Sequence, residues 1–110
     1  MSFEIISSIR FDRFIKRLAK KYVSMPDDFA RLLVELRNNP QTGEPLGRDC
    51  YKVRMSIAAK NKGKSGGARV ITCVKIVGET VFLLTIYDKS EQESISDSER
   101  DELLRENGLL

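Results

Sequence analysis

Histidine is absent from this chain of 110 residues. Its absence removes the commonest general base and the usual zinc ligand of proteins. A metal site would therefore need clustered carboxylates, and the closest group in the sequence, Asp88, Glu91 and Glu93, surrounds Lys89. Carboxylates beside a lysine are poor ligands for a metal ion, because the positive charge of the lysine opposes binding of another cation. We expect neither a metal nor another cofactor.

Cysteine and long apolar runs are also scarce. Cys50 and Cys73 lack CxxC spacing, and we expect both to be reduced thiols in the core or on a strand. The longest apolar run, residues 81–87, is far below the roughly 20 residues of a membrane span. The N-terminus has no basic start followed by a long apolar stretch, so no secretory signal is predicted. These features predict a cytoplasmic protein without a membrane partner.

Charge is distributed unevenly along the chain. Residues 1–90 carry 17 Lys and Arg against 9 Asp and Glu, whereas residues 91–110 carry 2 against 7. The net charge of +3 therefore combines a strongly basic body with an acidic end. A basic body favours polyanions such as nucleic acid. The length and the lack of repeats or linkers predict a single domain over residues 1–110.

Two amphipathic helices are predicted in the first 40 residues. Apolar residues recur at helical spacing in residues 8–22, and Ser8 is suited to cap that helix. A second helix is expected after Ser24, which has the spacing of a capping box with Asp27. It should end before Pro40. Consecutive helices with a short link predict a helical hairpin.

The period then changes to that of strands. Residues 51–57 alternate between apolar and polar side chains, which predicts a half-buried strand with a basic outer face. Residues 68–77 and 80–87 are β-branched and apolar, and residues 78–79 are expected to join them as a two-residue hairpin turn. The three segments predict an antiparallel meander.

Shorter elements complete the predicted fold. Residues 3–6 can add an edge strand, and residues 96–108 are expected to form a short helix, because Ser96 and Glu99 have capping-box spacing. The prediction is an α+β fold in which two N-terminal helices pack on a small antiparallel sheet, with a short C-terminal helix.

The loop before residue 68 is rich in glycine and lysine. The letters "GKS" at residues 63–65 suggest a phosphate-binding P-loop, but that motif requires a glycine at position 58, which is Ala58. It also requires a helix to follow, where a strand is predicted. The sequence therefore excludes a nucleotide-hydrolysing enzyme of this type.

Cations of the strands and the loop are expected to share one surface, because alternate residues of neighbouring strands face the same way. Such a surface suits an RNA backbone, and it can stabilise the charge of a pentavalent phosphate while the RNA 2′-hydroxyl attacks. A lysine crowded by cations has a lowered pKa and can serve as a base. The same pattern is typical of a solvated turn and ordinary surface, so the residues alone leave both interpretations open.

Several segments resemble the RelE/ParE superfamily of bacterial toxins, which belong to type II toxin–antitoxin modules. They are "FIKRLAKKY", "NPQTGEPLG", "YKVRM", "GKSGGARVI" and "LLTIYDKSEQESIS". Together they span about residues 11–96, and "GKSGGARVI" followed by "IYDKSE" is similar to the RelE-like branch, which includes HigB-like toxins.

The resemblance implies a small, metal-independent endoribonuclease, or mRNA interferase, that enters the ribosomal A site and cuts mRNA. Attack by the 2′-hydroxyl would leave a 2′,3′-cyclic phosphate and a 5′-hydroxyl, and translation would stop. The implied partners are the ribosome with its mRNA and a cognate antitoxin. Operator DNA would be bound only through the complex with the antitoxin.

The resemblance also implies the site residues. Arg54 matches the arginine of the family's "YK[VI]R" motif, Lys64 the lysine of "GKSGG", and Arg69 the arginine of "GGARVI". The predicted catalytic residues are Arg54, Lys64, Arg69, Tyr87 and Lys89. The predicted RNA-binding residues are Lys52, Lys60 and Lys62.

One departure from the family pattern lies in the last segment. Several ribonuclease members carry Tyr or His in the terminal helix, and residues 90–110 contain neither. Tyr87 is therefore expected to take that role, or the cations to act alone. The alternatives are a ParE-like, gyrase-inhibiting toxin and a largely non-catalytic antitoxin-binding protein.

Overall fold

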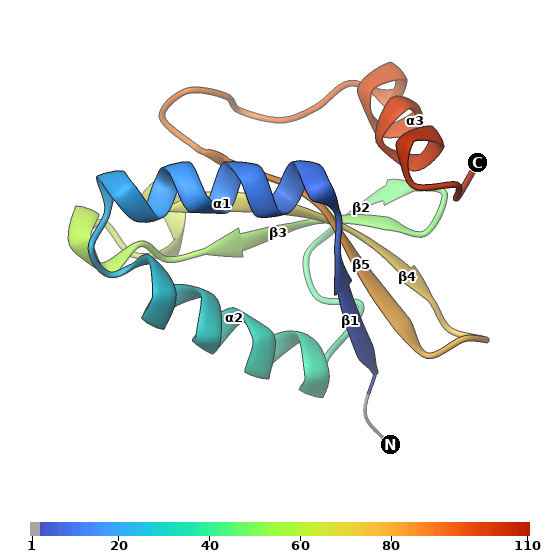
Figure 1. The fold of residues 1–110 in the computed structure, drawn as a ribbon, viewed down its shortest axis with the longest axis horizontal. Coiled ribbons are helices and arrows are strands. Elements are labelled where there is room, and N and C mark those ends of the chain that lie inside the picture. Colours follow the sequence, from blue (N-terminus) through green and yellow to red (C-terminus); the bar gives the residue numbers. More distant parts are fainter. Residues whose placement is uncertain (1–2) are drawn as a thin grey trace.

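A five-stranded sheet carries two helices on one face and a third helix on the other (Figure 1). The computed structural model describes residues 3–110. The strands are β1 (Glu4–Ser7), β2 (Glu44–Gly47), β3 (Cys50–Met55), β4 (Ala68–Lys75) and β5 (Thr80–Asp88). The helices are α1 (Ile9–Lys21), α2 (Met25–Asn38) and α3 (Asp97–Glu106), and two short 3-10 turns, Ala58–Lys60 and Lys64–Gly66, lie between β3 and β4.

The strand order is β1-β5-β4-β3-β2. Strands β3, β4 and β5 are antiparallel, as predicted. Strand β2 adds an antiparallel pairing with β3, and β1 joins the edge of β5 in parallel. The α+β prediction is confirmed. Strand β2 was not predicted, because its hairpin with β3 turns through Arg48 and Asp49, both at positive φ. Asn or Gly usually signals such a turn, and neither is present at these two positions.

The β4–β5 turn is longer than predicted. Lys75 pairs with Thr80, so residues 76–79 form a four-residue turn instead of the two-residue turn at 78–79. The side chain of Val77 is fully exposed and gains nothing from continuing the strand. The prediction, which rested on the β-branched residues alone, therefore made β4 too long.

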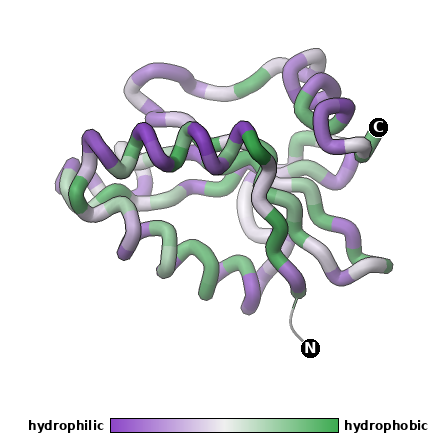
Figure 2. Tube along the Cα trace, viewed as in Figure 1, coloured by the Kyte–Doolittle hydropathy of each residue, from purple (hydrophilic) through white to green (hydrophobic). Residues whose placement is uncertain are grey.

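Helix α1 matches its prediction closely. The Ser8 hydroxyl accepts a hydrogen bond from the Phe11 amide at 2.9 Å, which confirms the predicted cap. Phe11, Ile15 and Leu18 face the sheet. Figure 2 shows the regular alternation of hydrophobic and hydrophilic residues along this helix.

Helix α2 is present, but the predicted capping box between Ser24 and Asp27 is wrong. Ser24 makes no side-chain cap and has helical backbone angles. Its hydroxyl instead donates to Asp28 at 2.7 Å and accepts from the Ala59 amide at 2.9 Å. A long-range contact to the loop therefore replaces the local cap.

The second face of the sheet is covered by α3. Its predicted capping box between Ser96 and Glu99 is confirmed, with both hydrogen bonds at 3.1 Å. Leu103 and Leu104 of this helix pack on a small core that contains Cys50 and Cys73, which are buried free thiols. Within residues 3–110, no helix is both long and apolar enough to cross a membrane.

Candidate functional site

Five of the eight predicted site residues line one groove of about 570 Å³. They are Lys52, Arg54, Lys64, Arg69 and Lys89. Three acids, Glu35, Glu44 and Glu93, also line it, so cations outnumber acids. The groove opens beside β3 and β4, under the loop that joins them. Its excess positive charge suits an anionic ligand.

Strand register explains why these cations meet. Arg54 on β3 pairs with Arg69 on β4, and Arg69 pairs with Tyr87 on β5. Directly paired residues share a face, so the three side chains form a row across the sheet. Lys52 precedes Arg54 by two residues and faces the same way. This is the face opposite the one that carries α1 and α2, whose core uses the alternate residue Val53.

Arg69 is the most rigidly held cation of the groove. Its residue is only 4% exposed. One terminal nitrogen, Nη1, donates to the carbonyls of Lys64 and Ala68 at 3.0 Å, and Nη2 donates to the carbonyl of Ser65 at 3.3 Å. Among residues 3–110 it has no ion pair. Loop carbonyls therefore fix the guanidinium without neutralising its charge.

The groove lysines are held more loosely. Each has one carboxylate nearby: Lys64 with Glu35 at 3.5 Å, Lys89 with Glu93 at 3.4 Å, and Lys52 with Glu44 at 3.8 Å. In each pair at least one partner is exposed, and surface pairs contribute only about 0–1 kcal/mol. An incoming anion can therefore replace these acids at little cost. Arg54 is exposed and forms no ion pair with any residue from 3 to 110.

Lys60 lies outside the groove. Its ammonium contacts a carboxylate oxygen of Asp88 at 2.7 Å, and the phenol of Tyr22 donates to the other oxygen at 2.5 Å. Burial alone would raise the pKa of Asp88, but hydrogen bonds from Lys60, Tyr22 and Ser90 outweigh it and hold that pKa well below its usual range. This buried pair ties the loop to the end of β5. Its geometry points to a structural role for Lys60.

Lys62 also does not line the groove. It is exposed, and the carbon stem of its side chain lies over Gly66. A Cβ at position 66 would lie 2.5 Å from the Lys62 Cβ. The absence of a side chain at Gly66 therefore lets the loop fold back on itself.

Tyr87 lies at the end of the cationic row, yet it borders a different cavity. That cavity, of about 280 Å³, lies between α1, β5 and α3. The Tyr87 hydroxyl donates to the carbonyl of Glu93 at 3.4 Å. Burial raises the pKa of Tyr87 to about 12, although the charge of Arg69 opposes the shift. The phenol is therefore protonated near neutral pH and cannot act there as a base.

Asp28 is a residue that the sequence did not single out. It is buried, and both of its carboxylate oxygens face the Ala58 amide, at 3.2 and 3.3 Å. Ser24 and Arg31 also donate to it, each at 2.7 Å. Asp28 thus fixes the start of the loop that supplies Lys64. An acid in the first turn of a helix is ordinarily explained by the helix dipole. No local sequence pattern therefore indicated that Asp28 contacts the loop.

Within the described part of the chain, no three His, Cys, Asp or Glu residues gather as a metal site requires.

Comparison with known proteins gives one family match. Residues 9–107 match the family model described as the RelE toxin of the RelE/RelB toxin–antitoxin system.

Solved structures with a similar fold include three from E. coli. A mutant of the toxin RelE in the free state has a TM-score of 0.61 at 19% identity, over 84% of this chain and 90% of that chain. The isolated RelE toxin has 0.60 at 18%, over 94% and 97%. The intact RelBE toxin–antitoxin complex has 0.59 at 18%, over 78% and 95%. At these identities the likeness shows a shared fold.

Proposed function

Because the chain belongs to the RelE family of toxins from toxin–antitoxin systems, we propose that it is a ribosome-dependent endoribonuclease that cleaves mRNA in the A site and so inhibits translation. The observation that carries the proposal is the groove in which four cations gather around a fifth, the fixed guanidinium of Arg69.

Binding of the mRNA strand follows from the charges of the groove. The phosphates would displace the acids that now accompany Lys52, Lys64 and Lys89, because those pairs are 3.4–3.8 Å long and have at least one exposed partner, and surface pairs are weak. Arg54 forms no ion pair among residues 3–110, so a phosphate that binds it displaces none of those acids. The backbone contacts position the strand without reading its sequence, which suits an enzyme that meets many messages.

The proposed reaction uses the RNA's own nucleophile. The 2′-oxygen attacks the adjacent phosphorus, the bond from phosphorus to the 5′-oxygen breaks, and the 2′-proton is transferred away while the leaving oxygen gains a proton. The products are a 2′,3′-cyclic phosphate and a 5′-hydroxyl. The protein orients the strand and stabilises the negative charge that grows on the phosphate.

Arg69 is the best-suited group for that stabilisation. A guanidinium has five N–H donors, and three are used on loop carbonyls, so two are left for phosphate oxygens. The group is already oriented and largely buried, so it needs no reorganisation when charge develops. Arg54 and Lys64, which are exposed and line the same groove, supply further positive charge. Tyr87, protonated at neutral pH, is limited to donating a proton or supporting the row.

The partners follow from the same proposal. The E. coli RelBE structure is a toxin–antitoxin complex, and we extend that arrangement to a cognate antitoxin for this chain. The ribosome and its mRNA are the proposed target, so the protein would act in the cytoplasm. Operator DNA would be reached only through the antitoxin complex.

A translation extract tests the proposal. Wild type should truncate the message, while Lys64→Ala and Arg69→Ala should each cleave about 10²–10³-fold more slowly, the usual loss for one charge-stabilising group. Lys75→Ala is the control, because Lys75 is partly exposed and lies outside the groove. Full-length message with wild type would contradict the proposal, and DNA breaks on expression in cells would instead favour gyrase as the target.

A further inference from the structure

The outer face of α1 is crowded with positive charge that the proposed reaction does not use. The helix carries six cations and one acid, Asp12. Four of the cations, Arg13, Lys16, Arg17 and Lys20, follow the spacing i, i+3, i+4, i+7 and therefore share one face. All four are exposed.

Of the cations of this helix, only the remaining two pair with an acid among residues 3–110. Arg10 forms an ion pair with Glu106 of α3, and Lys21 approaches Glu91 at 4.0 Å. The four cations of the shared face form no ion pair with residues 3–110. Like charges three and four residues apart destabilise a helix. Arg17 lies over the Phe14 ring at 5.2 Å, but the contacts of α1 with the sheet use the apolar side chains of the opposite face.

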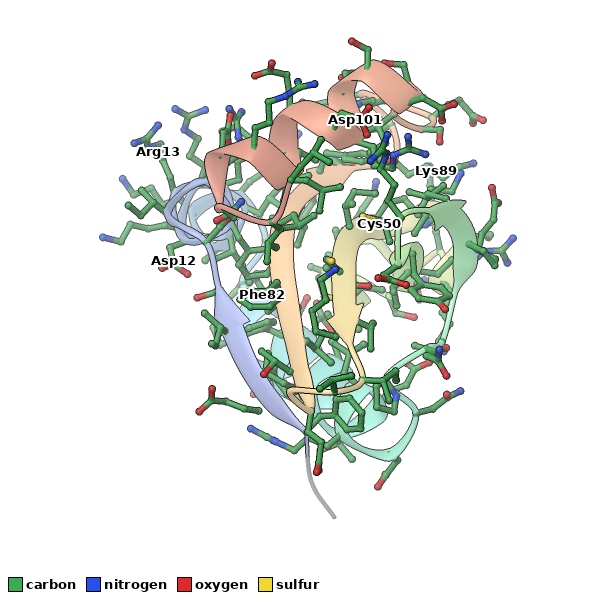
Figure 3. All side chains as sticks on the ribbon, turned by 90° about the vertical axis from the view of Figure 1, so that its right-hand side faces the viewer. Asp12, Arg13, Cys50, Phe82, Lys89 and Asp101 are labelled. Carbon is green, nitrogen blue, oxygen red and sulfur yellow. The ribbon has the colours of Figure 1, made fainter. Side chains whose placement is uncertain are left out.

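This surface and the groove lie on different sides of the molecule. The groove cations project from the sheet face that carries α3, whereas α1 packs on the other face. Figure 3 shows Arg13 at one side of the sheet and Lys89 at the other. The α1 cations are thus separated from the groove by the sheet and by the thickness of a helix, about 10 Å. A short strand held in the groove cannot also bind α1.

We propose that this face of α1, formed by Arg13, Lys16, Arg17 and Lys20, is a second RNA-binding surface that holds the phosphate backbone of folded ribosomal RNA while the groove holds mRNA. The inference rests on the proposed function, because it concerns how the toxin is held at its target. Unpaired Lys and Arg in a continuous row, without an apolar centre, match phosphates. The core of a protein interface, in contrast, is depleted in charge.

Ribosome binding tests the proposal directly. In the first variant, Arg13, Lys16, Arg17 and Lys20 are all changed to Gln. In the control, four cations outside α1 and the groove, Arg37, Arg48, Lys75 and Arg105, are changed to Gln, so that both variants have the same net charge. Affinity for purified ribosomes is measured by co-sedimentation over a range of salt concentrations.

The α1 variant should bind at least about tenfold more weakly at physiological salt, and its salt dependence should be shallower by about 0.7–0.9 in slope for each phosphate that it no longer neutralises. Its KM for ribosomes should rise with kcat unchanged. The control should stay within about threefold of wild type, since its substituted cations lie elsewhere. Equal affinity and equal slope for the two variants would overturn the proposal, as would loss of antitoxin binding with ribosome binding intact.

Two further measurements separate the possible causes of a weaker affinity. The α1 variant should unfold at the same or a higher temperature than wild type, because Gln relieves the repulsion and has about the same helix propensity as Lys and Arg. Changing Arg13 and Arg17 to Lys should retain binding, since the charge is kept. Lys64→Ala should bind ribosomes but cleave mRNA about 10²–10³-fold more slowly than wild type. If wild type binds ribosomes through α1 but leaves mRNA intact, the proposed nuclease function is refuted and the proposed α1 surface is still supported.

Discussion

Arg54 of β3 and Arg69 of β4 lie directly opposite each other, so that two guanidinium groups form one cross-strand pair. Like charges in this position destabilise a sheet. Loop carbonyls accept hydrogen bonds from Arg69, which offsets this repulsion. Arg54, in contrast, remains exposed and without an ion pair among residues 3–110. We infer that the pair is kept for its ligand and not for the stability of the fold.

The two arginines should therefore respond differently to substitution. Arg54→Gln should slow cleavage by about 10²–10³-fold and leave stability unchanged or raised by about 0.2–1 kcal/mol. Arg69→Gln should also slow cleavage, but it should lower stability by about 1–3 kcal/mol, because one buried carbonyl and two partly buried carbonyls lose their donor. Single-turnover cleavage and urea unfolding measure the two effects. Arg54→Gln with wild-type activity would contradict the account.

Asp88 and Lys60 predict an acid-dependent contribution to stability. The folded pKa of Asp88 lies well below the unfolded value of about 3.9. The carboxylate therefore stabilises the fold above about pH 4, and this contribution is lost as pH falls toward the folded pKa. Asp88→Asn, which leaves Lys60 without its partner, should lower stability at pH 7 by on the order of 3 kcal/mol. The gap to wild type should narrow at pH 3.

Denaturant unfolding at both pH values measures this gap. Glu91→Gln is a suitable control, because its exposed pair with Lys21 at 4.0 Å should change stability by about 0.5 kcal/mol or less. A gap for Asp88→Asn of the same size at pH 3 and pH 7 would exclude the proposed linkage.

The helices and the central strands were predictable from the sequence because their signals are local. The apolar spacing of residues 9–21 and the alternation of residues 50–55 are set by neighbouring side chains that face one core. Strand β2 escaped prediction, since Arg48 and Asp49 give no usual turn signal. The parallel pairing of β1 with β5 joins segments about 75 residues apart and has no local signature.

The candidate site was predictable in part for the same reason. Lys52 and Arg54 could be assigned to one face from strand alternation, and Arg69 lies across from them in register. The contact of Lys60 with Asp88 spans 28 residues, and that of Tyr22 with Asp88 spans 66. A loop lysine that folds inward to a buried acid has the same sequence pattern as one that faces solvent, so only the structure separates Lys60 from Lys64.

Tyr87 predicts an alkaline effect. Its pKa is about 12 in the fold and about 10 when unfolded. The neutral phenol therefore stabilises the fold below about pH 10, and that stability is lost as pH rises toward 12. Tyr87→Phe should be less sensitive to alkali over this range, and cleavage by wild type should show no change between pH 6 and 9 that follows ionisation of Tyr87, because the phenol stays protonated there. Thermal unfolding against pH checks the first part. A rate dependence that follows the ionisation of Tyr87 would refute the second.

Gly67 should be the least replaceable glycine of the loop. A Cβ there would lie 2.0 Å from the carbonyl oxygen of Met55, which is backbone and cannot move aside easily. Gly67→Ala should therefore destabilise the protein by more than about 2 kcal/mol and disturb the loop that orients Arg69. Gly78→Ala is the matched control, since its Cβ would meet only Thr80 at 3.6 Å. Its stability should change by less than about 1 kcal/mol. Equal stability of the two variants would contradict the loop geometry.

Removing one atom of the substrate, the 2′-oxygen of the sugar immediately 5′ to the scissile phosphate, tests the central claim most directly. Single-turnover cleavage is measured on programmed ribosomes with an mRNA that carries either a 2′-hydroxyl or a 2′-deoxy sugar immediately 5′ to the scissile phosphate. With the hydroxyl, wild type should yield a 2′,3′-cyclic phosphate end, and Arg69→Gln should yield it far more slowly. With the deoxy sugar, no cut should occur at that position. Equally fast cleavage of the two messages would mean that the cationic groove does not act by stabilising attack of the RNA's own oxygen.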